Sequence, residues 1–262
     1  RDAGQLVIDA TTATSLLPSQ IVLGGTLASN ATGGRGFEVD ILADSLAVVA
    51  QYTGAGQRVE LLASDLNKLS ADSLLLGATR RHQGADVALD VRAQDVTVES
   101  GAAVAAPEVL LAARDSVTVA DGASISAAED DRTRATETIQ LTGDSALVRI
   151  SAGGQVRVER KPVAGATPGT TGTINVAAGA VLDAARSITL DASRDTVVDG
   201  DLRTHNGSLS LAAASVSLGE TQGVTGGLVL SNDDVARLSA RDLTLNSRST
   251  IDLYGRIALD AE

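Results

Sequence analysis

Short segments in which apolar and polar residues alternate recur along the whole chain. Val117-Thr118-Val119, Val156-Arg157-Val158 and Leu243-Thr244-Leu245 are examples. This two-residue period is that of a half-buried β-strand, and helical spacing does not fit these segments. The many Ala residues leave a helical repeat as an alternative. Abundant β-branched residues and turn pairs such as Asp121-Gly122 and Asn206-Gly207 favour strands.

The alternating segments belong to a longer repeated phrase, in which an aliphatic residue is followed by a small stretch rich in Ala, Asp and Ser and then by the alternating residues. Eight copies begin at Ile41, Leu69, Leu89, Leu111, Ile150, Leu190, Leu211 and Leu238, and a ninth begins at Leu259. Several neighbouring copies begin about 20 to 22 residues apart, and two wider gaps are close to two such periods. A period of this length predicts a solenoid.

A coil of about 21 residues accommodates three short strands and three turns, and coils stack at the strand spacing of about 4.8 Å. The predicted fold is therefore all-β, a right-handed parallel β-helix in which residues 1–262 form a single segment. Within this fold, Leu209-Ser210-Leu211 is predicted to place Leu211 inward and Ser210 outward.

Three stretches break the rhythm and are predicted to leave the coils as loops: residues 128–138, 160–173 and 219–227. The first is highly charged, and the second contains Pro162 and Pro168, which cannot donate a hydrogen bond to a strand ladder. Such loops are ordinarily solvated bulges, but loops on a rigid scaffold also carry binding surfaces.

Composition narrows the fold and the partners further. Hydrophobic residues make up 44% of the chain, but Phe37, Tyr52 and Tyr254 are the only aromatics, which suits the thin core of a solenoid. The net charge of −12 makes nucleic acids and anionic membrane surfaces unsuitable partners. No cysteine is present, so disulfides and thiolate metal sites are excluded. No apolar stretch approaches the length of a membrane-spanning helix.

The two ends of the sequence suggest a piece of a larger protein. The opening RDAGQLVIDA lacks the basic and apolar regions of a signal peptide, and the repeat continues to the final residues without a polar capping segment. We therefore expect this sequence to be either a mature protein or a fragment of a longer chain, and the fragment is favoured.

Catalytic residues, cofactor-binding residues and metal ligands are not predicted. His82 and His205 lie in polar, turn-like settings far apart in sequence, and neither has a partner at metal-ligand spacing. The serines lack a nucleophile-elbow motif, and neither a P-loop nor a dinucleotide fingerprint is present. We therefore expect both histidines to be exposed residues in loops.

Aspartates that recur within the repeated phrase are candidate ligands for a calcium ion. These are Asp44, Asp72, Asp115, Asp195 and Asp242. They are expected to favour turns, and the Arg that precedes three of them would relieve charge repulsion without a metal. The segment from Gly33, GGRGFEVDI, matches a calcium-binding nonapeptide only in part and occurs once, so no calcium site is predicted. The sequences beginning at Asn30 and Asn206 fit the N-glycosylation pattern, which is short enough to arise by chance.

Phrases such as LSARDLTLNSRSTIDLYG, ALVRISAGGQVRVER and INVAAGAVLDAARSITLDAS resemble the filamentous haemagglutinin family of exported bacterial proteins. The resemblance covers roughly residues 36–262 and rests on recurrence rather than on any one motif. It implies a β-helical filament, secreted through a partner transporter in the outer membrane and present at the cell surface or released. It also implies adhesion, aggregation or presentation of a distal effector domain. The NPNG-like phrases of the family's secretion domain are absent here, so the chain would be interior shaft.

Two functions from different classes therefore compete. The first is a non-enzymatic structural or adhesive shaft of a secreted surface protein, whose partner is a receptor or polysaccharide on a host or bacterial cell. The second is a β-helical protein that binds or degrades polysaccharides. A degrading enzyme generally needs aromatic platforms and a fixed cluster of acids or bases, so the scarcity of aromatics favours the shaft.

Overall fold

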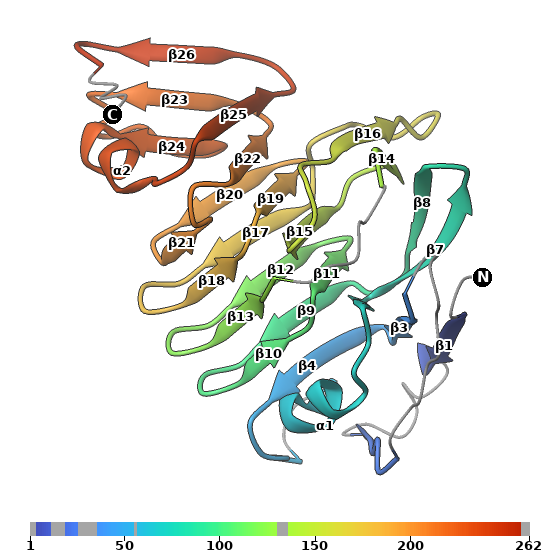
Figure 1. The fold of residues 1–262 in the computed structure, drawn as a ribbon. Helices are drawn as coiled ribbons and strands as arrows, with labels where there is room; N and C mark the ends of the chain where they lie inside the picture. The colour runs from blue at the N-terminus through green and yellow to red at the C-terminus, as the bar shows by residue number, and fades with distance from the viewer. Residues whose placement is uncertain (1–3, 12–18, 26–35, 55–56, 130–135, 258–262) are drawn as a thin grey trace.

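A computed structural model describes residues 4–11, 19–25, 36–54, 57–129 and 136–257 of the chain. Strands hold 53% of the described residues and helices 6%, so the prediction of an all-β chain is confirmed. The strands form five sheets, and most neighbouring strands are parallel (Figure 1).

Three of the sheets run through the body of the molecule. The long sheet contains, in spatial order, β1 (Gln5–Asp9), β3 (Glu38–Leu42), β6 (Ser73–Leu76), β11 (Glu108–Ala113), β15 (Ala146–Ser151), β19 (Ser187–Ala192), β22 (Ser208–Ala213) and β25 (Asp242–Ser247). The seven-stranded sheet contains β2 (Ser19–Ile21), β5 (Val59–Leu62), β4 (Ser45–Val49), β9 (Asp95–Val98), β12 (Ser116–Val119), β17 (Thr173–Val176) and β20 (Asp195–Val198). The narrow sheet contains β10 (Ala103–Ala105), β13 (Ser124–Ala127), β18 (Val181–Ala184) and β21 (Asp201–Arg203).

Some passes of the chain add one strand to each of these three sheets. One pass consists of β11, β12 and β13, and another of β19, β20 and β21. Asp95 pairs with Ser116, Ala103 with Ser124, and Ser187 with Ser208, and in each pair the partner lies one predicted period further along the chain. The predicted period therefore holds where one pass follows another without an insertion.

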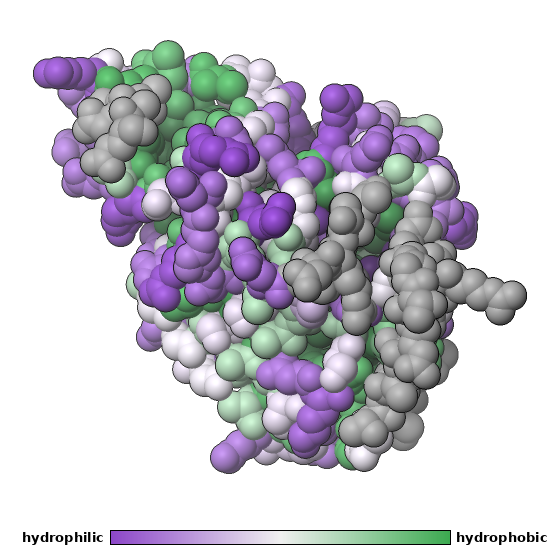
Figure 2. All heavy atoms as spheres, viewed as in Figure 1, coloured by the Kyte–Doolittle hydropathy of each residue, from purple (hydrophilic) through white to green (hydrophobic). Residues whose placement is uncertain are grey.

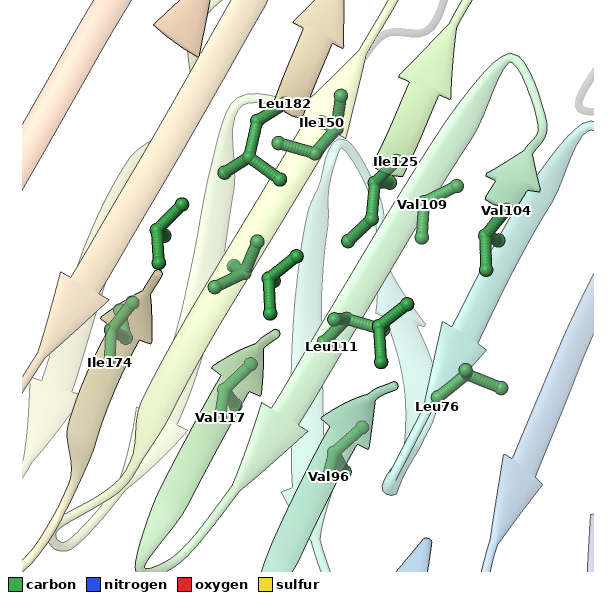
Figure 3. Packing of buried hydrophobic residues seen from close by; sticks show 14 of the residues in the cluster. Leu76, Val96, Val104, Val109, Leu111, Val117, Ile125, Ile150, Ile174 and Leu182 are labelled. Atoms are coloured by element: carbon green, nitrogen blue, oxygen red, sulfur yellow. The ribbon is translucent and has the colours of Figure 1, made fainter. Parts of the chain in front are cut away.

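Aliphatic side chains from the three sheets stack in rows between them (Figure 3). Val96, Val117 and Ile174 are in register on the seven-stranded sheet, while Ile125 and Leu182 are in register on the narrow sheet. All of these side chains are fully buried. The space between the sheets is narrow enough for Val, Ile, Leu and Ala to fill, which explains how a sequence with three aromatics builds a core.

Two copies of the repeated phrase do not lie where their spacing predicted. Leu76, in the copy that begins at Leu69, pairs with Leu111, which lies well beyond one period along the chain. Leu89 belongs to β8 (Asp86–Val91), which forms an antiparallel hairpin with β7 (Ala78–Gln83) outside the three stacked sheets. The phrase marks any corner between two half-buried strands, because each such corner needs small polar residues in its turn. The spacings of 20 and 22 residues from Leu69 to Leu89 and from Leu89 to Leu111 therefore do not each correspond to one coil.

The copy that begins at Ile150 differs from the predicted parallel stacking in another way. After β13 the chain leaves the body to form β14 (Thr138–Thr142), returns as β15 and leaves again as β16 (Arg157–Lys161). Because β15 enters the long sheet from outside, it runs antiparallel to both neighbours, β11 and β19. Regular passes resume at β17, where Thr173 pairs with Ser116 of the last pass before the insertion. The long sheet is thus not purely parallel.

The predicted loops overlap with strands at their edges. Residues 162–172 and 220–227 lie outside strands, whereas Arg160 and Lys161 belong to β16 and Thr173 begins β17. Of residues 128–138, Thr138 begins β14, and residues 130–135 lie outside the described residues.

A four-stranded side sheet, in the order β16, β14, β8 and β7, packs on the outer face of the long sheet (Figure 1). A second apolar cluster fills the space between them and includes Leu75, Leu110 and Leu147 of the long sheet with Ile139 and Leu141 of β14. Where the side sheet covers it, the outer face of the long sheet is therefore also buried, as in sheets covered on both sides.

Leu211 and Ser210 test the predicted direction of the side chains in β22. Leu211 lies in the main core and is 0% exposed, as predicted. Ser210 points to the opposite face, but it is only 5% exposed because residues 155–160 lie across from it. Its direction is as predicted, and its exposure is not.

The C-terminal part forms a small terminal sheet of β24 (Leu228–Ser231), β23 (Val216–Gly219) and β26 (Ile251–Tyr254), beside the short helix α2 (Asn232–Arg237). The other helix, α1 (Ala63–Lys68), follows β5. Ile251 and Leu253 are 53% and 64% exposed, and hydrophobic spheres gather over this end in Figure 2.

Candidate ligand-binding groove

The two histidines are separate from each other and each is paired with a carboxylate. His82 Nε2 lies 2.7 Å from Glu38 Oε2, and His205 Nε2 lies 2.7 Å from Asp183 Oδ1. Within the described ranges, no three His, Asp or Glu side chains gather as a metal ion would require. Of the nonapeptide-like segment, residues 33–35 lie outside the described residues.

The recurring aspartates do not form one row. Asp195 begins β20 in the seven-stranded sheet, whereas Asp242 begins β25 in the long sheet. Asp195 and Asp242 each form an ion pair with the preceding arginine, at 3.2 Å and 2.9 Å. Arg114, which precedes Asp115, instead donates to the carbonyl oxygen of Val91. The corner aspartates thus satisfy local hydrogen bonds and ion pairs at different edges of the molecule.

A chain of buried polar contacts crosses the outer face of the long sheet. Arg80 Nε donates to Asp40 at 2.7 Å, and Arg80 Nη1 donates to the Ser73 hydroxyl at 2.7 Å. Ser73 donates to Glu108 at 2.7 Å, and Glu108 is paired with Arg149. Asp40, Ser73, Glu108 and Arg149 occupy outward positions of the long sheet, and Arg80 reaches them from β7 of the side sheet. All five residues are buried. Burying such charges requires the full set of partners that the network supplies.

A second cluster of charges lies where β16 passes over the long sheet. Arg160 Nε and Nη2 donate to Asp191 Oδ1 at 2.9 and 2.6 Å, and Arg248 Nη2 donates to the same oxygen at 2.6 Å. Arg160 Nη1 also donates to the Gly143 carbonyl and the Ser145 hydroxyl. Burial lowers the pKa of Arg160, Asp191 opposes this effect, and Arg248 adds to it. One carboxylate therefore faces two guanidinium groups.

This cluster forms one end of a groove of about 570 Å³ between β16 and the outer face of β22 and β25. Its floor includes Ser210, Thr244 and Asn246, and one wall includes Gln155 and Arg157. Gln155 Nε2 donates to Thr244 Oγ1 at 3.1 Å across the groove. The groove thus combines hydroxyl and amide groups with positive charge.

A neighbouring cavity of about 600 Å³ shares Arg160 and Arg248 with the groove. It lies under the loop of residues 162–172, which Asp144 anchors by accepting hydrogen bonds from the backbone N–H groups of Gly169, Thr170 and Thr171. Burial raises the pKa of Asp144, but these hydrogen bonds outweigh burial and keep its pKa below the ordinary value. The loop is therefore fixed beside the two arginines.

The sequence did not predict the arginines of this groove as site residues. For Arg157 and Arg160, one signal is present in VRVERK, where arginines occupy an alternating strand. Such a residue needs a buried or partly buried partner. The partner itself lies 31 residues away for Arg160 and 57 for Arg248, so local sequence does not reveal it.

No protein-family model, curated protein or solved structure matches the chain. Neither of the short helices within the described ranges is long and apolar enough to span a lipid bilayer. The fold and the groove therefore define an all-β protein with stacked, mainly parallel sheets and a polar, arginine-containing groove on its side.

Proposed function

We propose that the chain is a right-handed parallel β-helix that serves as the shaft of a secreted bacterial surface protein, in adhesion, aggregation or presentation of a distal effector domain. The observation that carries the proposal is the repeated register of one period, which recurs in the long, seven-stranded and narrow sheets. Repeats that each contact only their neighbours produce length, which is the property a shaft needs.

The role at the cell surface, and export through an outer-membrane transporter, rest on the resemblance of the repeated phrases to filamentous haemagglutinins. The thin aliphatic core and the net charge of −12 support a soluble, extended protein of this kind. The alternative of a polysaccharide-degrading enzyme has less support, because the described residues contribute one carboxylate to the groove lining, Asp191, which two arginines already engage. Common glycoside hydrolysis uses a pair of carboxyl groups.

Duplication of one pass tests the architecture. A second copy of residues 187–207 inserted after Gly207 keeps the junctions natural, because Ser187 and Ser208 begin paired strands. We expect the longer chain to fold, to melt cooperatively and to lengthen by about 4.8 Å in small-angle scattering. An insertion of the same segment in scrambled order is the control. Unfolding of both insertions alike would contradict the proposal.

Adhesion is tested with beads that carry the purified chain. We expect these beads to be retained on layers of bacterial or epithelial cells under flow more strongly than albumin-coated beads. Release of sugar fragments from polysaccharides by the same protein, without retention of the beads, would favour the enzymatic alternative.

A further inference from the structure

The groove beside β16 has a charge opposite to that of the protein as a whole. Among the residues that the structure describes, its lining contains Arg157, Arg160 and Arg248 and one carboxylate, Asp191, in a chain whose net charge is −12. A positive site on an acidic surface selects for a ligand that carries its own negative charge at a defined point.

The two arginines at Asp191 play different parts. Arg160 has a side chain only 12% exposed, and its guanidinium donates to Asp191, Gly143 and Ser145. It is therefore engaged in holding β16 against the long sheet. Arg248 shares the same carboxylate oxygen, but its side chain is 29% exposed. Because Arg160 already balances the charge of Asp191, the positive charge of Arg248 remains available to a ligand.

The rest of the groove presents groups that bind hydroxyls. Ser210 and Thr244 are register partners on adjacent strands, and Asn246 lies two residues beyond Thr244. Val156 and Val158 of the opposite wall add apolar surface. Hydroxyl, amide and aliphatic groups around one guanidinium match a sugar ring that bears a carboxylate, whose oxygens accept two parallel N–H bonds from arginine.

We propose that this groove binds an acidic oligosaccharide built of uronic acid units. A ring carboxylate lies against Arg248 and Arg157, and ring hydroxyls bond to Ser210, Thr244 and Asn246. The volume of about 570 Å³ is in the range that holds ligands of several rings and is much more than a single inorganic anion fills. The site goes beyond the shaft proposal and does not require the chain to form a filament.

The test is calorimetric titration of the whole chain with a tetramer of galacturonic acid. Methyl-esterified tetramer, which keeps the hydroxyls and loses the charge, and inorganic phosphate, which has charge without a sugar, are titrated in parallel. We expect the acid tetramer to bind with an affinity that falls as salt rises, and the ester and phosphate to bind at least about tenfold more weakly.

Two variants locate the site. Arg248→Gln is expected to weaken binding of the acid tetramer about tenfold. Arg58→Gln is the matched control, because Arg58 also forms a 2.6 Å ion pair and has a side chain 37% exposed, but lies outside the groove. Thr244→Val is expected to weaken binding while preserving its salt dependence. Thermal melts verify that each variant is folded.

Several results would overturn the inference. These are absence of binding at tetramer concentrations of about 10 mM, equal affinity for the ester or for phosphate, and equal effects of Arg248→Gln and Arg58→Gln. None of them bears on the shaft, whose length is measured independently by duplication of a pass.

Discussion

Arg149 on β15 forms an ion pair with Glu108 on β11, with 2.7 Å between Nη2 and Oε1, and their side chains are only 1% and 8% exposed. The ion pair joins β15, which runs antiparallel to its neighbours, to β11, the last parallel strand before it in the long sheet. Arg149 also donates to the hydroxyls of Ser151 and Ser187, so its guanidinium is bound on several sides.

Removal of one partner of this ion pair should destabilise the folded chain. We expect Arg149→Met to lower the free energy of unfolding by about 3–5 kcal/mol, because Glu108 keeps a buried charge without its main partner. The double variant Arg149→Met with Glu108→Leu should recover much of that loss. Urea unfolding of both variants measures the difference. A loss below about 1 kcal/mol in the single variant would mean that water reaches the pair.

The two faces of β22 should respond differently to a carboxylate. Leu211→Asp places an unpaired charge in the main core and should cost several kcal/mol, enough to unfold the adjacent passes. Ser210→Asp places the charge in the polar groove that Arg157 and Arg248 line, so its cost should be much smaller. Thermal melts compare the two variants. Equal destabilisation would show that the register of β22 is misassigned.

Two glycines have similar positive φ angles but different amounts of space around them. Replacing each by alanine distinguishes the cost of backbone strain from the cost of a steric clash. Gly77 has φ +89° and follows β6, where an added Cβ would lie 2.1 Å from the Ala112 carbonyl oxygen. Gly84, with φ +69°, lies in the β7–β8 turn with open space around it. Gly84→Ala should cost about 1–2 kcal/mol from strain alone. Gly77→Ala should cost roughly a further 1–3 kcal/mol from the clash, measured by urea unfolding. Equal costs would mean that the β6–β7 junction relaxes freely.

Acid should release the loop of residues 162–172. The pKa of Asp144 is lower in the folded chain than its ordinary value of 3.8, so the hydrogen bonds of its carboxylate stabilise the loop above that pH. This contribution is lost as the pH falls below about 3.8 and through the lower folded pKa. The protection of the Gly169–Thr171 amides, measured as observed exchange relative to intrinsic exchange at the same pH, should therefore fall over that window.

Asp144→Asn should make exchange in this loop fast already at neutral pH and remove its acid-dependent step. Asp199→Asn, in an exposed turn after β20, is the control and should leave the step in place. An unchanged acid-dependent step in Asp144→Asn would assign the effect to another group.

The alternation was sufficient to predict an all-β chain, and pairs such as Ser187 and Ser208 are 21 residues apart, but the path between the strands could not be predicted. Alternation identifies the inward side of a strand such as Leu209–Leu211 from a few adjacent residues. The phrase around Leu89 has the same alternation and turn residues, yet it forms a hairpin outside the stacked sheets. A local pattern encodes burial, and the hairpin is buried too, against the outer face of the long sheet.

The groove was beyond prediction for a related reason. Asp191 and Arg248 meet across a separation of 57 residues, and Arg160 joins them only because β16 folds back over the long sheet. Arg160 stands in an alternating strand segment and so indicates a buried partner, but no local pattern identifies that partner. The contact of Arg160 with Asp191 depends on the insertion between β13 and β17, whose path the repeat does not specify.

The reversed strand β15 also has a consequence for the order in which the molecule folds. A chain that emerges from its N-terminus can pair β12 with β9 as soon as one further pass is present, but β17 must wait for the whole stretch from β13 onward. Extending the closing loop from about 21 to about 57 residues adds only about 0.9 kcal/mol of entropy by the logarithmic law, so the obstacle is delay rather than instability. We expect pulsed hydrogen exchange during refolding to protect β9 and β12 before β17 and β20. Simultaneous protection would mean that the two halves fold as one unit.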